Sequence, residues 1–107
     1  MFDFGDGPVP AHQHRNGGGW VANTAQVADD AYVGPNAQVF DYAQVYGHAR
    51  VYGDARVFDY AQVYDNARVY GDALVFGDAQ VYDNARVYGD AWVYDNARVY
   101  GDTQVSE

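Results

Sequence analysis

The hydrophobic and polar residues of this chain follow a six-residue pattern from Gly19 onward. Valine occupies every sixth position from Val21 to Val105, and a small residue, nearly always alanine, stands two positions before each valine. A helix cannot hold residues six apart on one side, whereas residues two apart in a β-strand share a face. Gly, Asp or Asn commonly fill the last two positions of each hexad, and these residues accept the backbone of a tight corner. The pattern therefore predicts an all-β chain of short strands that bury Ala and Val and end at corners.

The residue before each valine indicates how many hexads make one coil. It is identical more often between hexads three apart than between hexads two or four apart, and Phe40, Phe58 and Phe76 are spaced by 18 residues. We therefore predict three strands and 18 residues per coil, and about five coils in the repeat domain 19–107.

This valine register resembles that of the hexapeptide-repeat proteins. The resemblance implies a single-stranded, left-handed parallel β-helix with a triangular cross-section. Many members of that family are acyltransferases that use a histidine at a subunit boundary, and some are zinc carbonic anhydrases that need three histidines from the coils. Here His48, beside Gly47 at a corner, is the only histidine in the repeats, and no loop interrupts the coils. We expect no catalytic residue, no cofactor and no enzyme activity, because the fold alone does not carry the function.

The two ends of the repeat differ in sequence. Residues 1–18 do not repeat, and we expect them either to cap the first coil, with Phe2 and Phe4 as plugs, or to form an arm that binds a partner. The last residues, VYGDTQVSE, keep the repeat register, so the last coil is expected to expose its edge. An exposed edge favours end-to-end stacking into a dimer or a filament.

With three strands per coil, the second and fourth residues of each hexad point outward and define three faces. The second face carries glutamine and tyrosine rows, and the third carries arginine and tyrosine rows near the corner acids Asp54, Asp72 and Asp90. The first face is the most apolar, and contiguous exposed apolar surface usually marks a contact site. We expect the following residues of this face and its corner to form an interface with another protein, most simply a second copy: Trp20, Phe40, Phe58, Leu74, Phe76, Trp92, Tyr94, Tyr42 and Tyr60.

Charge narrows the choice of partners. The chain has 15 acidic residues against 6 arginines, and its net charge is −9. Such a surface repels nucleic acid and anionic lipid, so we expect neither direct nucleic-acid binding nor membrane binding, although a basic protein would be attracted. The N-terminus lacks the features of a signal peptide and no apolar run could cross a bilayer, so the expected location is the cytoplasm.

These observations favour a non-enzymatic structural module, a stiff rod that self-associates through its aromatic face or its open coil end. One alternative is an acidic binding protein that imitates nucleic acid, of the kind that a phage encodes as an inhibitor. Another is a minimal acyltransferase-like protein that depends on His48. The His-x-His of His12 and His14 is expected to serve local structure, since two ligands make a poor metal site.

Overall fold

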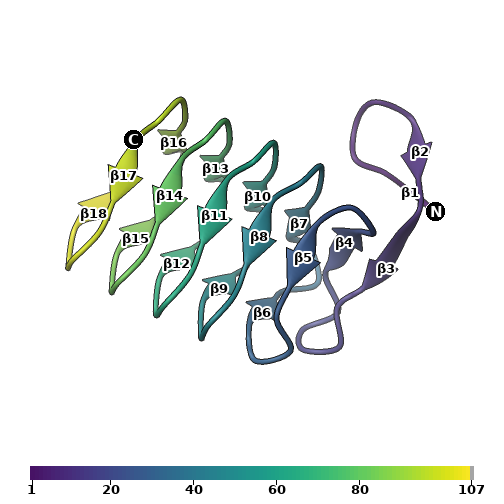
Figure 1. The fold of residues 1–107 in the computed structure, drawn as a ribbon, viewed down its shortest axis with the longest axis horizontal. Coiled ribbons are helices and arrows are strands. Elements are labelled where there is room, and N and C mark those ends of the chain that lie inside the picture. Colours follow the sequence, from purple (N-terminus) through teal and green to yellow (C-terminus); the bar gives the residue numbers. More distant parts are fainter. Residues whose placement is uncertain (107) are drawn as a thin grey trace.

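Each Ala-x-Val unit forms a short strand, and the chain turns a corner before the next strand begins. The computed structural model describes residues 1–106, and in it the strands stack into a β-solenoid of about five coils (Figure 1). Paired residues in neighbouring coils are 18 positions apart, as Arg56 with Leu74 and Val57 with Val75 show. The predicted coil length is therefore confirmed, while the left-handed sense stays a prediction.

The coils build three parallel sheets, one on each side of the solenoid. The first sheet contains β4 (Trp20–Ala22), β7 (Gln38–Val39), β10 (Arg56–Val57), β13 (Leu74–Val75) and β16 (Trp92–Val93). The second contains β5 (Gln26–Val27), β8 (Gln44–Val45), β11 (Gln62–Val63), β14 (Gln80–Val81) and β17 (Arg98–Val99). The third contains β6 (Tyr32–Val33), β9 (Arg50–Val51), β12 (Arg68–Val69), β15 (Arg86–Val87) and β18 (Gln104–Val105).

The core between the three sheets consists of the repeated alanines and valines. Every one of these residues from Ala31 to Val87 has no exposed surface, and Val27 and Val105 near the two ends are only half-buried. The small alanine lets three sheets meet across a narrow interior, and valine suits the pleated surface of a strand. The inward positions predicted from the sequence are therefore confirmed from Ala31 to Val93, whereas Ala97 and Thr103 in the last coil are exposed.

The corners depend on the fifth residue of each hexad. From Asp41 to Gly101 this residue is always Gly or Asp, and its φ lies between 56° and 67°. Glycine adopts this left-handed region without steric cost, and aspartate is among the few other residues that enter it readily. At Gly71 a side chain would meet a further restriction, because a Cβ atom would lie 2.8 Å from the backbone nitrogen of Gly89 in the next coil.

Aspartate at the fifth position also connects neighbouring coils. The Asp59 carboxylate accepts a hydrogen bond from the Gly77 N–H at 2.9 Å, and the Asp83 carboxylate accepts one from the Gly101 N–H at 3.0 Å. These corner acids are thus part of the ladder that holds the coils together, and the sequence signal for them is Asp in a position otherwise held by Gly.

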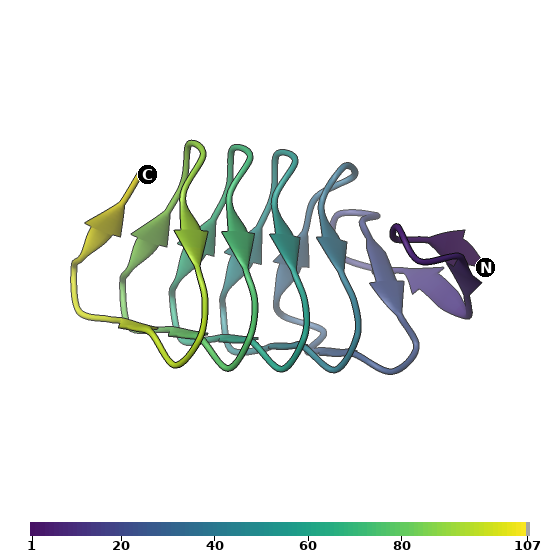
Figure 2. The same ribbon diagram turned by 90° about the horizontal axis from the view of Figure 1, so that it is seen from above.

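The N-terminal segment, residues 1–18, folds onto the first coil at the end opposite the C-terminus (Figures 1 and 2). Its strands β1 (Phe2–Asp3) and β2 (Pro8–Val9) form an antiparallel pair, and β3 (Ala11–Gln13) pairs antiparallel with β4. The buried His14 ring lies 2.8 Å from the carbonyl oxygen of Ala31 through its Nε2 atom, so this nitrogen donates a hydrogen bond there. These contacts favour the cap over the free arm.

Phe2 and Phe4 lie on the outer surface of the solenoid and do not enter its open end. Phe2 stacks on Trp20 with ring centroids 4.8 Å apart, and Phe4 stacks on Phe40 at 4.7 Å. The expectation that Phe2 and Phe4 plug the end of the coil is therefore wrong: the two rings lie flat on the first face. Large aromatic rings are available to stack on there, whereas the core accommodates only Ala and Val.

Among residues 1–106 there is no helix long and apolar enough to cross a membrane.

Candidate interaction surface

The first face, which is the outer surface of β4, β7, β10, β13 and β16 with its adjoining corner, carries a continuous stack of aromatic rings. Successive centroids are 4.7 Å apart from Phe4 to Phe40, 4.9 Å from Phe40 to Phe58, 5.0 Å from Phe58 to Phe76 and 5.4 Å from Phe76 to Tyr94. From Phe40 onward the strand spacing sets these distances, since equivalent residues of paired strands lie side by side. The rings of this face are therefore held in one continuous stack that follows the solenoid axis.

Exposure divides the expected interface residues into two groups. Trp20 and Phe40 are half-buried because the rings of the N-terminal segment cover them. Phe58, Leu74 and Phe76 are also half-buried, packed between their neighbours in the row. The remaining four, at the other end of the face and along its corner, are exposed: Tyr42, Tyr60, Trp92 and Tyr94.

The other two faces carry tyrosine rows. Tyr46, Tyr64, Tyr82 and Tyr100 stack on the second face, and Tyr52, Tyr70 and Tyr88 stack on the third. Among residues 1–106, four of the six exposed aromatic side chains belong to the first face and its corner, and the other two, Tyr46 and Tyr100, belong to the second. The first face is thus where exposed apolar surface is concentrated.

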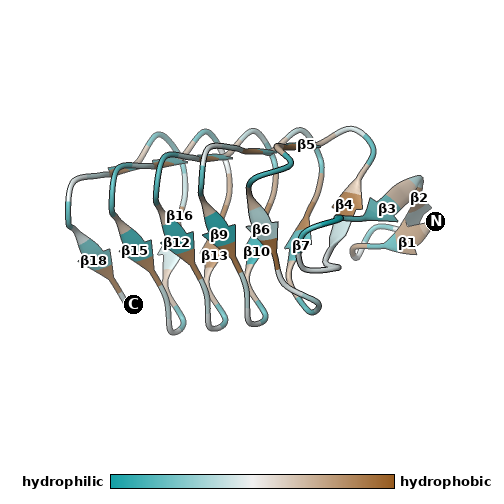
Figure 3. Cartoon of the chain, turned by 90° about the horizontal axis from the view of Figure 1, so that it is seen from below, coloured by the Kyte–Doolittle hydropathy of each residue, from teal (hydrophilic) through white to brown (hydrophobic). Residues whose placement is uncertain are grey.

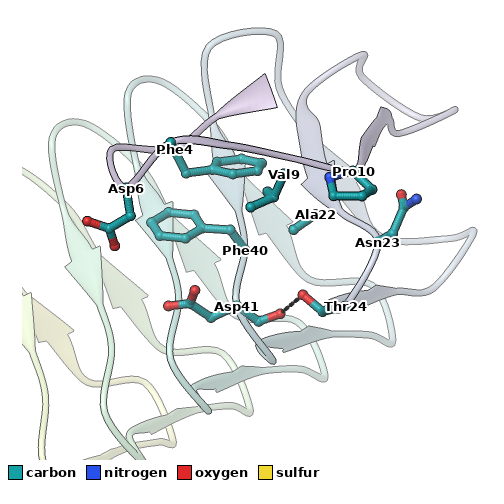
Figure 4. Close-up of a pocket in the computed structure, with 10 residues that line it drawn as sticks. Phe4, Asp6, Val9, Pro10, Ala22, Asn23, Thr24, Phe40 and Asp41 are labelled. Carbon is teal, nitrogen blue, oxygen red and sulfur yellow. Dashed lines mark hydrogen bonds between the residues drawn. The ribbon is translucent and has the colours of Figure 1, made fainter. Parts of the chain in front are cut away.

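A hollow of about 250 Å³ lies where the N-terminal segment meets the first face (Figure 4). Its walls are mainly apolar and include Phe4, Val9 and Phe40, while Asp6 and Asp41 stand at its rim. Burial raises the pKa of Asp41, a hydrogen bond from the Asp59 N–H lowers it, and the charges of Asp59 and Asp6 raise it further. The Thr24 hydroxyl donates a hydrogen bond to the backbone carbonyl of Asp41, so this corner is fixed to the first coil.

The histidines of the N-terminal segment are engaged in local contacts. His12 Nδ1 lies 2.7 Å from the Asn23 side-chain oxygen, and His14 is buried against the carbonyl of Ala31. His48 is exposed at its corner. Within the described part of the chain, no three His, Cys, Asp or Glu side chains are grouped so that they could hold a metal ion.

The stacked coils and their buried Ala/Val rows define a β-solenoid repeat protein. Residues 43–59, 61–77, 79–94 and 91–107 each match the family model described as YdcK beta solenoid repeat. These matches cover more than half of the chain, which therefore belongs to the YdcK beta solenoid repeat family. Comparison with curated proteins gave no match, and comparison with solved structures gave none either.

Proposed function

We propose that this chain is a non-enzymatic structural module that self-associates through its first face. The observation that carries the proposal is the concentration of exposed aromatic side chains on one surface: Tyr42, Tyr60, Trp92 and Tyr94 around the half-buried row of Phe58, Leu74 and Phe76. Phenylalanine and leucine gain nothing from contact with water, and burial in an interface would remove that apolar area from it.

The covered end of the face supports a contact at the other end. Phe2 and Phe4 already shield Trp20 and Phe40, so a partner would use the part of the face from Phe58 onward. Trp92 has 60% of its surface exposed, and tryptophan and tyrosine are the residue types that most often dominate binding energy. The self-association that we propose is therefore centred on β13 and β16.

The experiment compares solution mass in two matched double variants. In the first, Trp92→Asp and Tyr94→Asp place charges on the first face. In the second, Tyr46→Asp and Tyr100→Asp place the same charges on the second face, at side chains of similar exposure. Light scattering on a sizing column would follow mass against protein concentration, with circular dichroism as the control for folding.

We expect the unmodified chain to gain mass with concentration, the first-face variant to gain much less mass over the same range, and the second-face variant to associate as the unmodified chain does. A folded first-face variant that still associates equally would refute the proposed interface. An unmodified chain that stays monomeric at all concentrations would refute self-association itself.

A further inference from the structure

The third face, which is the outer surface of β6, β9, β12, β15 and β18 with its following corner, carries three parallel rows of side chains. The sequence Arg-Val-Tyr-Gly-Asp occurs three times on this face, at 50–54, 68–72 and 86–90. Because Arg50, Arg68 and Arg86 are paired in register, the repetition produces an arginine row, a tyrosine row and an aspartate row, each following the solenoid axis. Figure 3 shows these strands side by side, with a hydrophilic and a hydrophobic part in strands such as β12 and β15.

The two charged rows lack partners within the described chain. The one ion pair among residues 1–106 joins Arg15 to Asp29, so no carboxylate of these residues lies within ion-pair distance of Arg50, Arg68 or Arg86. Asp54, Asp72 and Asp90, at the corner where the chain leaves the third face, are exposed. Like charges directly opposite one another in paired strands are destabilising, so each row costs the isolated molecule free energy.

The acids on the other side of the arginine row are engaged differently. Asp65 and Asp83, at the corner that precedes the third face, each accept a hydrogen bond from the backbone N–H of the corner in the next coil. Asp54, Asp72 and Asp90 follow glycine, and within residues 1–106 their carboxylates accept no hydrogen bond, so both oxygens of each are free to meet a cation from outside.

The order of the rows makes the third face complementary to itself. Arginine stands two positions before each tyrosine and aspartate two positions after it. Consider a two-fold axis that runs along the tyrosine row, parallel to the solenoid axis. It places a second copy face to face with the first, with its strands running in the opposite direction and its coils stacked in the same direction. Arg50, Arg68 and Arg86 then face Asp54, Asp72 and Asp90 of the other copy, and the reverse holds on the far side of the axis. Because both rows have the same coil spacing, every pair aligns at once.

The other face-to-face arrangement is unfavourable. A two-fold axis parallel to the strands would place arginine opposite arginine and aspartate opposite aspartate, which costs free energy through like-charge contact. We infer that the third face is a docking surface for a second copy of this chain, in which the two solenoids lie side by side with their coils running in the same direction.

The composition of the face suits an interface between proteins. Tyrosine and arginine are enriched at such contacts, and the tyrosines would meet near the two-fold axis with the charged rows around them. Tyr52, Tyr70 and Tyr88 are held in one stack, with ring centroids 4.9 and 5.2 Å apart, so few side-chain rotations remain to be lost. This contact is independent of the first face, and a chain that uses both faces could form rows of more than two copies.

Salt dependence is the first test. Between about 0.01 M and about 1 M salt the Debye length falls from about 30 Å to about 3 Å, which weakens contacts between exposed charges. Sedimentation of the Trp92→Asp, Tyr94→Asp variant would isolate the third face from the first. We expect its dissociation constant to rise at least about tenfold across this range; association that is absent at low salt, or that strengthens with salt, would overturn the inference.

Charge reversal provides the sharper test. Both variants are made in the Trp92→Asp, Tyr94→Asp chain: one replaces Arg50, Arg68 and Arg86 with Glu, and the other replaces Asp54, Asp72 and Asp90 with Arg. Each should lose self-association through this face, while an equimolar mixture of the two should associate, because an all-acidic face then meets an all-basic one. Restoration in the mixture excludes misfolding as the cause of the loss. A mixture that remains monomeric, with both variants folded by circular dichroism, would overturn the inference.

Disulfide capture tests the orientation. The chain has no cysteine, so Tyr52→Cys and Tyr88→Cys can each be introduced singly. Parallel coils bring residue 52 next to residue 52 of the other copy, and the Tyr52→Cys variant alone should form a linked dimer on oxidation. Linkage only in a mixture of the Tyr52→Cys and Tyr88→Cys variants would indicate antiparallel coils and contradict the proposed axis.

Discussion

The corner glycines allow a direct test of how closely the coils approach one another. Gly71 has a φ of 67°, and a Cβ atom there would lie 2.8 Å from the nitrogen of Gly89 and 3.2 Å from its oxygen. Gly101 has nearly the same φ, 63°, yet a Cβ atom there would have nothing within 4 Å. The two glycines therefore share the conformational requirement and differ in the contact.

The two costs can be separated with alanine. A left-handed conformation costs an ordinary residue about 1–2 kcal/mol, which is the loss of stability that we expect for Gly101→Ala. Forcing an extra methyl group against packed backbone adds about 1–3 kcal/mol, so Gly71→Ala should lose about 2–5 kcal/mol. The Gly71→Asp variant should lose less than Gly71→Ala, because the Asp59 carboxylate at an equivalent corner already accepts the N–H of the glycine in the next coil.

Urea unfolding followed by circular dichroism would give the three free energies of unfolding, with the slope of each transition as a check that the unfolded states are alike. Equal losses for Gly71→Ala and Gly101→Ala would show that the coils can separate at the corner without cost. Equal losses for Gly71→Ala and Gly71→Asp would show that the carboxylate contributes nothing to the ladder.

Three further predictions concern the core, the aromatic row and one corner acid. Val63→Ala should lose about 2–3 kcal/mol of unfolding free energy in urea titrations because the side chain is fully buried, and Val27→Ala, at a half-buried position, should lose less. Phe58→Leu removes two stacked ring pairs, at 4.9 and 5.0 Å, and should lower the same free energy by about 1–3 kcal/mol; no change would mean that the stack follows the sheet without stabilising it. The fold raises the pKa of Asp41, so this group favours the folded state below its unfolded pKa and loses that contribution as pH rises through its folded pKa. Asp41→Asn should therefore raise the unfolding temperature slightly at neutral pH and lose this advantage at acid pH, and a pH-independent difference would contradict the assignment.

The coils could be predicted from the sequence because every coil repeats the same pattern of buried, outward and corner residues. A valine at every sixth position fixes which side chains are buried, and the 18-residue spacing of Phe40, Phe58 and Phe76 fixes which strands pair. A shift of one residue would move each valine from the core to the surface, so a pairing register shifted by one residue is excluded.

The N-terminal segment could not be placed in the same way. Its sequence does not repeat, and nothing in its spacing indicates whether Phe2 and Phe4 enter the core or lie on a face. The structure places Phe4 against Phe40, where it is buried, with 8% of its surface exposed. What decides the position is the size of the ring, which exceeds the space that Ala and Val leave between the sheets, and this follows from packing and not from period.

The separation of core and surface positions explains how three faces with different chemistry share one fold. The first and third residues of each hexad build the interior, so the second and fourth can change without altering the coil. Register then turns any choice at those positions into a row, because the same residue type returns at the strand spacing. A row of arginines carries a repulsion that a single arginine does not, and a row of apolar rings forms a patch that a single ring does not. In a solenoid, therefore, an outward residue that recurs in one sheet has a larger energetic consequence than one scattered among the three sheets. The rows of the first and third faces are for this reason the surfaces where contact with a second copy would remove the largest penalty.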